Sequence, residues 1–260
     1  MAARAIWKGV IHFGDVEVPV KLYAAVSDRG VHFRLLHDKD LQPVRQQMVD
    51  PVTGKVVEND DVRRAFQTDD GDLVMLDDDE LSELEPEASR QIEITRFVEP
   101  AAITHQWYDR PYFLGPDGDD DAYFALAAAL RKQDREGVAR WVMRKKEYVG
   151  ALRVEGEYLM LMTLRHAGEV VDASELDAPG GRALDDREVK MARQLVAALE
   201  DDLDMAAYRD EYRDRVMDLV DAKAEGKVVS FPTAKKKPTG KSLADMLEQS
   251  VKQTKRKSSG

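Results

Sequence analysis

The chain contains no cysteine among its 260 residues. The absence of thiols excludes a disulfide framework, a thiol nucleophile and a thiolate metal site, and it fits a reducing compartment. Long apolar runs are also missing. No stretch approaches the ~20 residues that a membrane-spanning helix needs, and the N-terminal segment has no signal-peptide core. We therefore expect a cytoplasmic protein that does not bind membranes.

Patterns typical of catalysis and metal binding are scarce as well. The five histidines are scattered and form no H-x-x-x-H pair. Gly240-Lys241-Ser242 ends like a phosphate-binding loop, but Lys235 stands where that loop requires glycine. Residues 117–121 begin like a calcium loop, but Ala122 occupies the position of the required glycine. We therefore predict a binding protein with no catalytic residue, no metal and no cofactor.

Positive charge is locally concentrated in a chain whose formal net charge is −11. Residues 131–153 hold eight Lys and Arg against three acids, and residues 235–260 hold eight against two. The stretch 69–93 has the opposite character, with eleven acids and one arginine. The acidic stretch is either a solvated surface or a face that excludes polyanions and confines them to the basic segments.

Short alternating segments dominate the first two thirds of the sequence. Residues 6–13 and 16–23 alternate apolar with polar side chains around a Gly14-Asp15 turn, which predicts an antiparallel strand pair. Residues 38–66 offer little to bury and contain a turn at 50–54, so we predict a long hairpin that projects from the body. Further strands are predicted at 31–37, 73–76, 92–98, 138–144, 148–154 and 158–165.

One helix interrupts these strands. An aromatic run at 111–116 closes in a Pro/Gly turn, and a helical pattern follows in which Tyr123, Leu126 and Leu130 share one face. We expect this central helix at about 121–134, ended by Gly137, and a shorter capped turn at 78–84. About eight strands with one central helix and short connections favour a β-barrel over alternating βαβ units.

After residue 171 the pattern becomes helical. Residues 187–203, preceded by a Leu184-Asp185-Asp186 cap, and residues 208–223 each carry one apolar face. These faces must bury against the same chain or against a partner. A Pro/Lys-rich linker at 230–241 leads to a short amphipathic helix at 242–252 and a basic end.

Several motifs occur in order between residues 3 and 225. They are Arg4-Ala5-Ile6-Trp7-Lys8-Gly9 with Phe13-Gly14, Val18-Pro19-Val20-Lys21-Leu22-Tyr23, the stretch Phe33 to Asp40, Tyr112-Phe113-Leu114-Gly115-Pro116-Asp117, Ala151-Leu152-Arg153 with Thr163-Leu164-Arg165, and Tyr208-Arg209-Asp210-Glu211-Tyr212. Together they resemble the prokaryotic Ku family. Two features depart from its pattern. The cysteines that many relatives carry near Met48 and Val52 are absent, which excludes metal bracing there, and Asp15 replaces a usually apolar turn residue.

The resemblance implies a fold that is mainly β with α: a Ku-type β-barrel core with a projecting β-hairpin bridge arm and a C-terminal helical arm. It also implies a homodimeric ring around duplex DNA, in which the helices embrace the partner's barrel. The implied function is sequence-independent binding of DNA double-strand ends, without catalysis, and recruitment and stimulation of DNA ligase D in non-homologous end joining. Such a protein would be nucleoid-associated. We place the core at 1–171, with the bridge arm at about 38–66, the helical arm at 172–228 and the flexible tail at 229–260.

Sequence-independent binding requires Lys and Arg side chains that face phosphates. The expected contacts in the core are Arg34, Lys39, Arg45, Lys55, Arg63, Arg64, Arg140, Arg144, Lys145, Lys146 and Arg153. Those expected in the tail are Lys235, Lys236, Lys237, Lys241, Lys255, Arg256 and Lys257. The expected ligase contacts are Leu243, Met246, Leu247 and Val251. For any single basic residue the alternative interpretation is a solvated strand face.

Two other functions remain open at this point. A general nucleic-acid-binding β-barrel would bind without preference for ends. A metal-dependent nuclease would use acidic pairs within Asp77, Asp78 and Asp79 to hold magnesium, although such a crowded run is also typical of a solvated turn. Magnesium-dependent cleavage of duplex DNA would separate the nuclease from both binding proteins.

Overall fold

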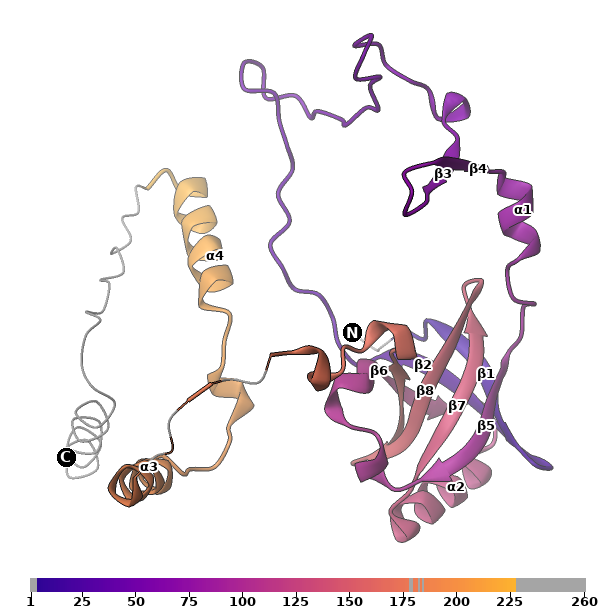
Figure 1. Cartoon of the computed structure of the whole chain (residues 1–260), viewed down its shortest axis with the longest axis vertical. Helices are drawn as coiled ribbons and strands as arrows, with labels where there is room; N and C mark the ends of the chain where they lie inside the picture. The colour runs from indigo at the N-terminus through magenta and orange to yellow at the C-terminus, as the bar shows by residue number, and fades with distance from the viewer. Residues whose placement is uncertain (1–3, 178–179, 182, 184, 228–260) are drawn as a thin grey trace. The chain divides into compact units, whose positions relative to one another are not determined.

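A computed structural model describes residues 4–177, 180–181, 183 and 185–227 (Figure 1). The predicted amphipathic helix at 242–252 and the basic tail therefore lie outside the described residues. The chain divides into two units, 1–29 with 33–175, and 176–260 with 30–32, which are treated separately below. No helix in the described ranges is both long and apolar enough to cross a membrane.

Seven strands in the described part of the first unit close into a barrel, in the order β1-β2-β6-β9-β8-β7-β5. Neighbouring strands are antiparallel except for β1 and β5, which are parallel and close the barrel. The predicted β-barrel is thus confirmed. The strands are β1 (Trp7–Phe13), β2 (Val16–Ala24), β5 (Gln91–Val98), β6 (Tyr108–Pro116), β7 (Glu136–Met143), β8 (Lys146–Glu155) and β9 (Tyr158–Leu164).

Aliphatic side chains fill the barrel. Alternate residues of a strand face the same side, so the apolar members of each alternating segment point inward together. Ile11, Leu22, Leu152 and Leu161, from four different strands, are completely buried in one cluster. Glycine is required where an aromatic ring packs directly against the backbone of a neighbouring strand. A Cβ at Gly150 would lie 2.5 Å from the Met162 carbonyl oxygen and 2.7 Å from the Trp141 ring.

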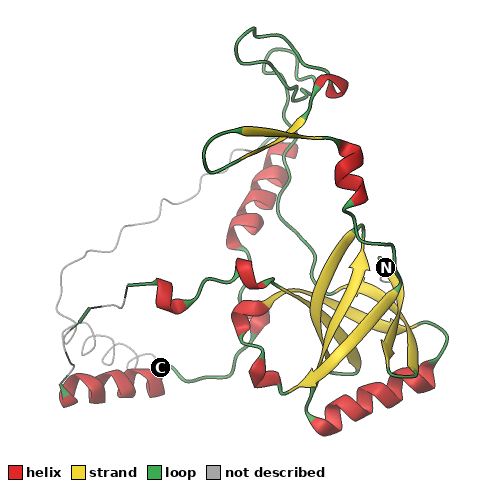
Figure 2. Cartoon of the chain, turned by 45° about the vertical axis from the view of Figure 1, so that its right-hand side comes forward, coloured by secondary structure: helices red, strands yellow, loops and turns green. Residues whose placement is uncertain are grey.

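The helix α2 (Asp120–Gln133) lies across one end of the barrel (Figure 2). Tyr123, Leu126 and Leu130 are buried, as their spacing predicts. The Tyr123 hydroxyl donates a hydrogen bond to the Leu114 carbonyl oxygen at 2.6 Å and accepts one from the Leu159 N–H at 2.8 Å. One buried side chain therefore joins the helix to both β6 and β9.

Two local predictions around this helix are wrong. The helix ends at Asp134, which adopts a left-handed conformation (φ 49°), and not at Gly137, which pairs with Leu152 inside the barrel sheet. The aromatic run at 111–116 does not close in a turn, because β6 continues through Gly115 and Pro116 in register with β2. Proline, which has no N–H to donate, is tolerated there because β6 no longer pairs with β9 beyond Leu114, so that side of the strand is an edge.

The opposite end of the barrel carries the root of a long insertion, residues 25–90. β2 ends there at Ala24, and the chain returns there because β5 runs parallel to β1, with Val10 opposite Gln91. β7 is antiparallel to β5, so the turn between β7 and β8 lies at this same end. The insertion and this turn thus share one end of the barrel, and α2 covers the other (Figure 1).

The insertion contains few regular elements. These are η1 (Asn59–Asp61), the hairpin of β3 (Arg64–Gln67) with β4 (Leu73–Leu76), and α1 (Asp78–Glu83). The predicted turn at 50–54 is confirmed: the Asp50 carboxylate accepts hydrogen bonds from the Val52 N–H at 2.9 Å and the Thr53 hydroxyl at 2.6 Å. β4, predicted as a strand of the body, pairs with β3 instead, so the exposed part of the insertion continues beyond residue 66.

The strand predicted at 31–37 is wrong. Phe33 and Leu35 are 66% and 64% exposed, and the segment contributes only an isolated bridge between Leu36 and Pro43. Alternating apolar residues favour a strand only where a neighbouring strand can pair with them, because strand propensity reflects packing on a partly buried surface. This part of the insertion has no such neighbour among the described residues.

Short helical turns lie between β5 and β6 and after β9, and two helices form the second unit. The turns are η2 (Pro100–Ala102), η3 (His105–Trp107), η4 (Ala167–Glu169) and η5 (Ala173–Glu175). The second unit contains α3 (Asp186–Ala198), η6 (Met205–Ala207) and α4 (Glu211–Ala224). Both predicted helices are present but shorter than predicted. The acidic residues Asp201, Asp202 and Asp204 separate them, since Asp favours caps and turns over helix interiors.

Replacing Tyr123 by Phe tests the junction between the helix and the barrel. We expect a loss of about 1–3 kcal/mol in the free energy of unfolding, because both buried hydrogen bonds of the Tyr123 hydroxyl would be lost. Urea unfolding measures this quantity. The control is Tyr158→Phe, whose side chain is 55% exposed. Equal stability of Tyr123→Phe and the wild type would contradict the assigned role.

Candidate nucleic-acid interface

Three of the predicted phosphate contacts lie together in the turn between β7 and β8. Arg144 and Lys145 form a two-residue loop, and Lys146 begins β8 directly opposite Met143. All three side chains are exposed. The topology described above places them at the end of the barrel from which the insertion starts, so they form a cationic edge beside its root.

The backbone of this turn is unusual for its residues. Arg144 and Lys145 both have positive φ angles, 53° and 63°. Two-residue turns of this kind strongly favour Asn-Gly, because left-handed backbone is unfavourable for residues with long side chains. Each residue costs on the order of 1 kcal/mol in that conformation. The chain therefore keeps two adjacent cations at a position where other residues would be more stable.

The side chains of the cationic edge make only weak interactions with neighbouring groups. The Lys145 Nζ lies 2.8 Å from the Glu85 Oε2, in the stem through which the insertion returns to the barrel. Because the Lys145 side chain is 73% exposed, this ion pair contributes little to stability. The Lys146 Nζ lies 5.6 Å from the centroid of the Tyr148 ring. Arg144 forms no ion pair within the described part of the chain, so its charge is available to a ligand.

The predicted contacts within the insertion are all exposed, but they differ in their partners. Arg63 donates hydrogen bonds to the carbonyl oxygens of Asp60 and Val62 at 3.0 and 3.3 Å. Arg64 lies 3.3 Å from Asp78 in an exposed ion pair. The remaining four form no ion pair among the described residues; they are Arg34, Lys39, Arg45 and Lys55. The insertion therefore offers separate cations and not a continuous basic surface.

Two predicted contacts lie on the strands themselves. Arg140 is exposed on β7, opposite Glu93 of β5 in the strand register. Arg153 lies near the other end of β8, and its guanidinium is 3.4 Å from Glu136, a carboxylate that is only 2% exposed. A buried carboxylate requires a compensating cation, and Arg153 supplies it. The structure thus does not bring Arg153 together with the cationic edge.

A third residue completes the buried group around Glu136. The Tyr108 hydroxyl donates a hydrogen bond of 2.7 Å to the Glu136 Oε2. Burial, together with this hydrogen bond to a carboxylate, raises the pKa of Tyr108 to about 12. The hydroxyl therefore remains protonated and continues to donate. This network fastens the start of β6 to β7, which makes it a structural element of the barrel wall.

The acidic run at 77–80 has a local structural use. The Asp77 N–H donates to the Glu80 carboxylate at 2.9 Å in a capping box that begins α1. Asp78 is engaged by Arg64. Across the described ranges no group of three or more His, Asp or Glu side chains is placed to hold a metal ion.

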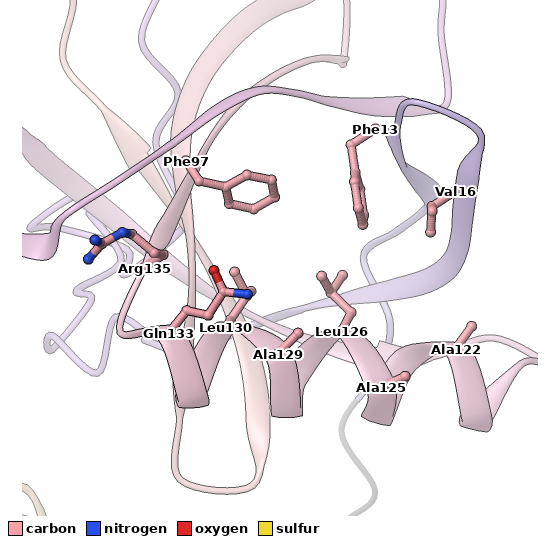
Figure 3. A pocket seen from close by; sticks show the side chains of 10 residues that line it. All are labelled: Phe13, Val16, Phe97, Ala122, Ala125, Leu126, Ala129, Leu130, Gln133 and Arg135. Carbon is pink, nitrogen blue, oxygen red and sulfur yellow. The ribbon is translucent and has the colours of Figure 1, made fainter.

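An apolar groove lies at the α2 end of the barrel and differs chemically from the cationic edge. Phe13 and Phe97 meet edge to face above the helix, with ring centroids 5.8 Å apart (Figure 3). Leu126 and several alanines of α2 line the floor of a cavity of about 450 Å³. Arg135, the cation that lines it, lies 3.4 Å from Glu99. This groove therefore does not present a row of cations to phosphates.

One cation near the root of the insertion was missed by the sequence-based predictions. Arg90 directly precedes β5, and its carbonyl oxygen accepts a hydrogen bond of 2.8 Å from the Val10 N–H. It is the single arginine among the eleven acids of residues 69–93, and that composition concealed it. Its position could have identified it, because Arg90 immediately precedes the predicted strand with which the chain returns from the insertion to the barrel.

Comparisons with known proteins agree with one another. Residues 12–191 match the family model described as the Ku70/Ku80 beta-barrel domain. The non-homologous end joining protein Ku 2 of Geotalea uraniireducens is 34% identical, over 97% of this chain and 99% of the relative. Two proteins named non-homologous end joining protein Ku are also similar. That of Mycobacterium tuberculosis is 37% identical, over 86% of this chain and 84% of the relative. That of Coxiella burnetii is 33% identical, over 100% and 99%.

Replacing Arg144 and Lys145 by Asn-Gly tests the cationic edge, because we expect it to change the stability of the protein and its affinity for DNA in opposite directions. We expect the free energy of unfolding to rise by about 1 kcal/mol as the strain is relieved. We expect the affinity for duplex DNA to fall, with the salt slope reduced by about one unit for each phosphate that the variant no longer neutralises. The control variant Arg144→Gln with Lys145→Gln removes the charges and keeps the strain. Unchanged DNA affinity of the Asn-Gly variant would show that this turn does not touch DNA.

Proposed function

This chain belongs to the Ku family, and on that basis we propose that it binds the ends of double-stranded DNA in non-homologous end joining, without regard to base sequence. The observation that carries this proposal is the exposed insertion with its separate cations, rooted beside the cationic edge of a closed barrel. Relatives that cover almost the whole chain are named for this repair process. We expect a binding protein and not an enzyme.

The chemistry of the exposed cations favours phosphate contacts over base recognition. Long Lys and Arg side chains on irregular backbone can reach phosphates, which are the same in every sequence. Reading bases in the major groove typically requires a helix or strand ribbon placed in the groove. Binding by Arg45, Lys55, Arg63, Arg64 and the cationic edge would therefore be driven by release of counterions and weakened by salt.

Exposed apolar residues in the insertion support a homodimer. Phe66 and Leu73 are 63% and 68% exposed, and Val52 at the tip of the Asp50 turn is 91% exposed. Such side chains are unfavourable in water and favour a partner surface. A two-fold arrangement in which two insertions cover each other would bury them on both copies. Two joined insertions and two barrels would then form a ring around the duplex.

The second unit supports the same conclusion independently. Its helices carry apolar residues that remain in water, including Val196, Leu199 and Tyr212, which are 71%, 65% and 63% exposed. Among its described residues no apolar side chain is buried. Short helices obtain their stability mainly from packing of an apolar face. We propose that the helical arm, residues 172–228, docks on the barrel of the second subunit.

The tail at 229–260 is assigned a separate task. Its sequence combines a basic segment with the apolar positions Leu243, Met246, Leu247 and Val251 at helical spacing. We propose that the helix predicted there from the sequence recruits and stimulates DNA ligase D, and that the basic residues around it add salt-sensitive contacts with DNA. Association with the nucleoid would follow from the binding of DNA.

Topology provides the test that distinguishes this function from general nucleic-acid binding. DNA can enter a closed protein ring only by one of its own ends. We therefore expect tight binding to linear duplex and weak binding to closed circles of the same length. Shuffling the base sequence should leave the affinity unchanged. Competition binding at a fixed salt concentration measures both effects. Equal affinity for linear and circular DNA would contradict the ring and leave a general DNA-binding barrel.

Charge reversal tests the role of the insertion. We expect Arg45→Glu, Arg63→Glu and Arg64→Glu together to abolish binding to linear duplex, because three attractive interactions become repulsive. Variants with one or two of these changes should lower the salt slope by about one unit per substituted arginine. The matched control reverses Arg131, Lys132 and Arg135, three basic residues at the α2 end. Equal losses of affinity in both triple variants would mean that net charge, and not the insertion, governs binding.

A further inference from the structure

A small cavity lies where the insertion returns to the barrel. Its volume is about 280 Å³. Three separate parts of the chain form its walls: Trp7 at the start of β1, the returning stem from Pro86 to Arg90, and the turn with Arg144 and Lys145. We propose that this cavity binds one nucleotide of an unpaired strand, with the phosphate between Arg90 and Arg144 and the base against Trp7.

Charge makes the cavity suited to a phosphate. Neither Arg90 nor Arg144 forms an ion pair in the described part of the chain, although both line the same space. Two arginines that line one cavity place like charges around it, and an anion bound there offsets their repulsion. Arginine also matches the geometry of phosphate oxygens through paired N–H donors. Lys145 reaches the same space but is paired with Glu85 at 2.8 Å, so the two arginines are the available anion ligands.

The aromatic wall is held in a fixed position. The Trp7 ring lies on Gly9 so closely that a Cβ there would be 2.2 Å from the ring and 2.7 Å from the Arg90 carbonyl oxygen. Trp7 and Gly9 belong to the inward-facing residues of β1, which places the indole at the mouth of the barrel. A fixed aromatic face next to two arginines is the combination with which proteins bind single-stranded nucleic acid.

The size of the cavity distinguishes this ligand from duplex DNA. The volume accommodates one nucleotide and has no room for a base pair. A base can stack on Trp7 only when it is free of its complementary strand. This inference rests on the proposed function and adds a class of ligand to it: the unpaired nucleotides of a DNA end that carries an overhang.

The first experiment compares two DNA ends on the complete protein. Affinities are measured for a blunt duplex and for the same duplex with a short single-stranded overhang. For Arg90→Gln we expect the affinity for the overhang duplex to fall roughly tenfold more than the affinity for the blunt duplex, the scale of one lost hydrogen bond to a charged phosphate. Arg135→Gln, at the α2 end, is the matched control and should leave the ratio unchanged. An unchanged ratio in Arg90→Gln would overturn the proposal.

The second experiment requires no DNA end, so it separates failure of this site from failure of the proposed function. We expect a deoxynucleoside monophosphate to quench the tryptophan fluorescence of the wild type, with a smaller response in Arg90→Gln. The chain has three tryptophans, and Trp7→Phe assigns the response to Trp7 while retaining an aromatic ring. Binding of inorganic phosphate as tightly as the nucleotide would show that the base contributes nothing and would overturn the proposal.

Discussion

The parallel pairing of β1 with β5 is the constraint on which the rest of the structure depends. It closes the barrel through Val10, Ile11 and His12 against residues 91–93. Because β5 must run in the same direction as β1, the chain that leaves β2 has to return to the same end before β5 can begin. The insertion is therefore rooted at one end of the barrel, and the β7–β8 turn is brought to the same end by the strands that follow. The opposite end is left for α2, whose buried face fits that position.

The sequence predicts the barrel well because its signals are local. Alternation along a strand and helical spacing on α2 both reflect burial against one core, so β5, β7, β8, β9 and α2 could be located from periodicity. The same signal fails at 31–37, where alternation occurs without a neighbouring strand. It also fails at 111–116, where Gly115 and Pro116 suggest a turn but remain in the register of β6. Both errors arise because local patterns do not show whether a segment has a strand to pair with: the segment 31–37 has none among the described residues, and residues 112–116 pair with β2, which is distant in sequence.

The residues of the candidate interface are harder to predict from the sequence than the barrel is. Charge counts identified the turn at 144–146, but they could not distinguish Arg144 from Arg153. These two arginines lie on the same hairpin and differ in what surrounds them: Arg153 compensates the buried Glu136, whereas Arg144 faces a cavity. Arg90 was missed because it lies in an acidic stretch of the sequence, although it lines the same cavity as Arg144. Whether a cation is available to a ligand depends on tertiary partners, and composition does not contain that information.

Barrel closure also determines the order in which this chain can fold during synthesis. β1 and β2 are adjacent and can pair early, but the free edge of each is covered only by strands made much later, β6 beside β2 and β5 beside β1. At common rates of synthesis, roughly seven to thirty seconds pass between the completion of β2 and that of β9, which completes the barrel. During much of this interval the first hairpin has open edges, and an open edge can pair with another nascent chain. The long insertion lengthens this exposure, so a chaperone that shields strand edges should matter more for this protein than for a barrel built from consecutive hairpins.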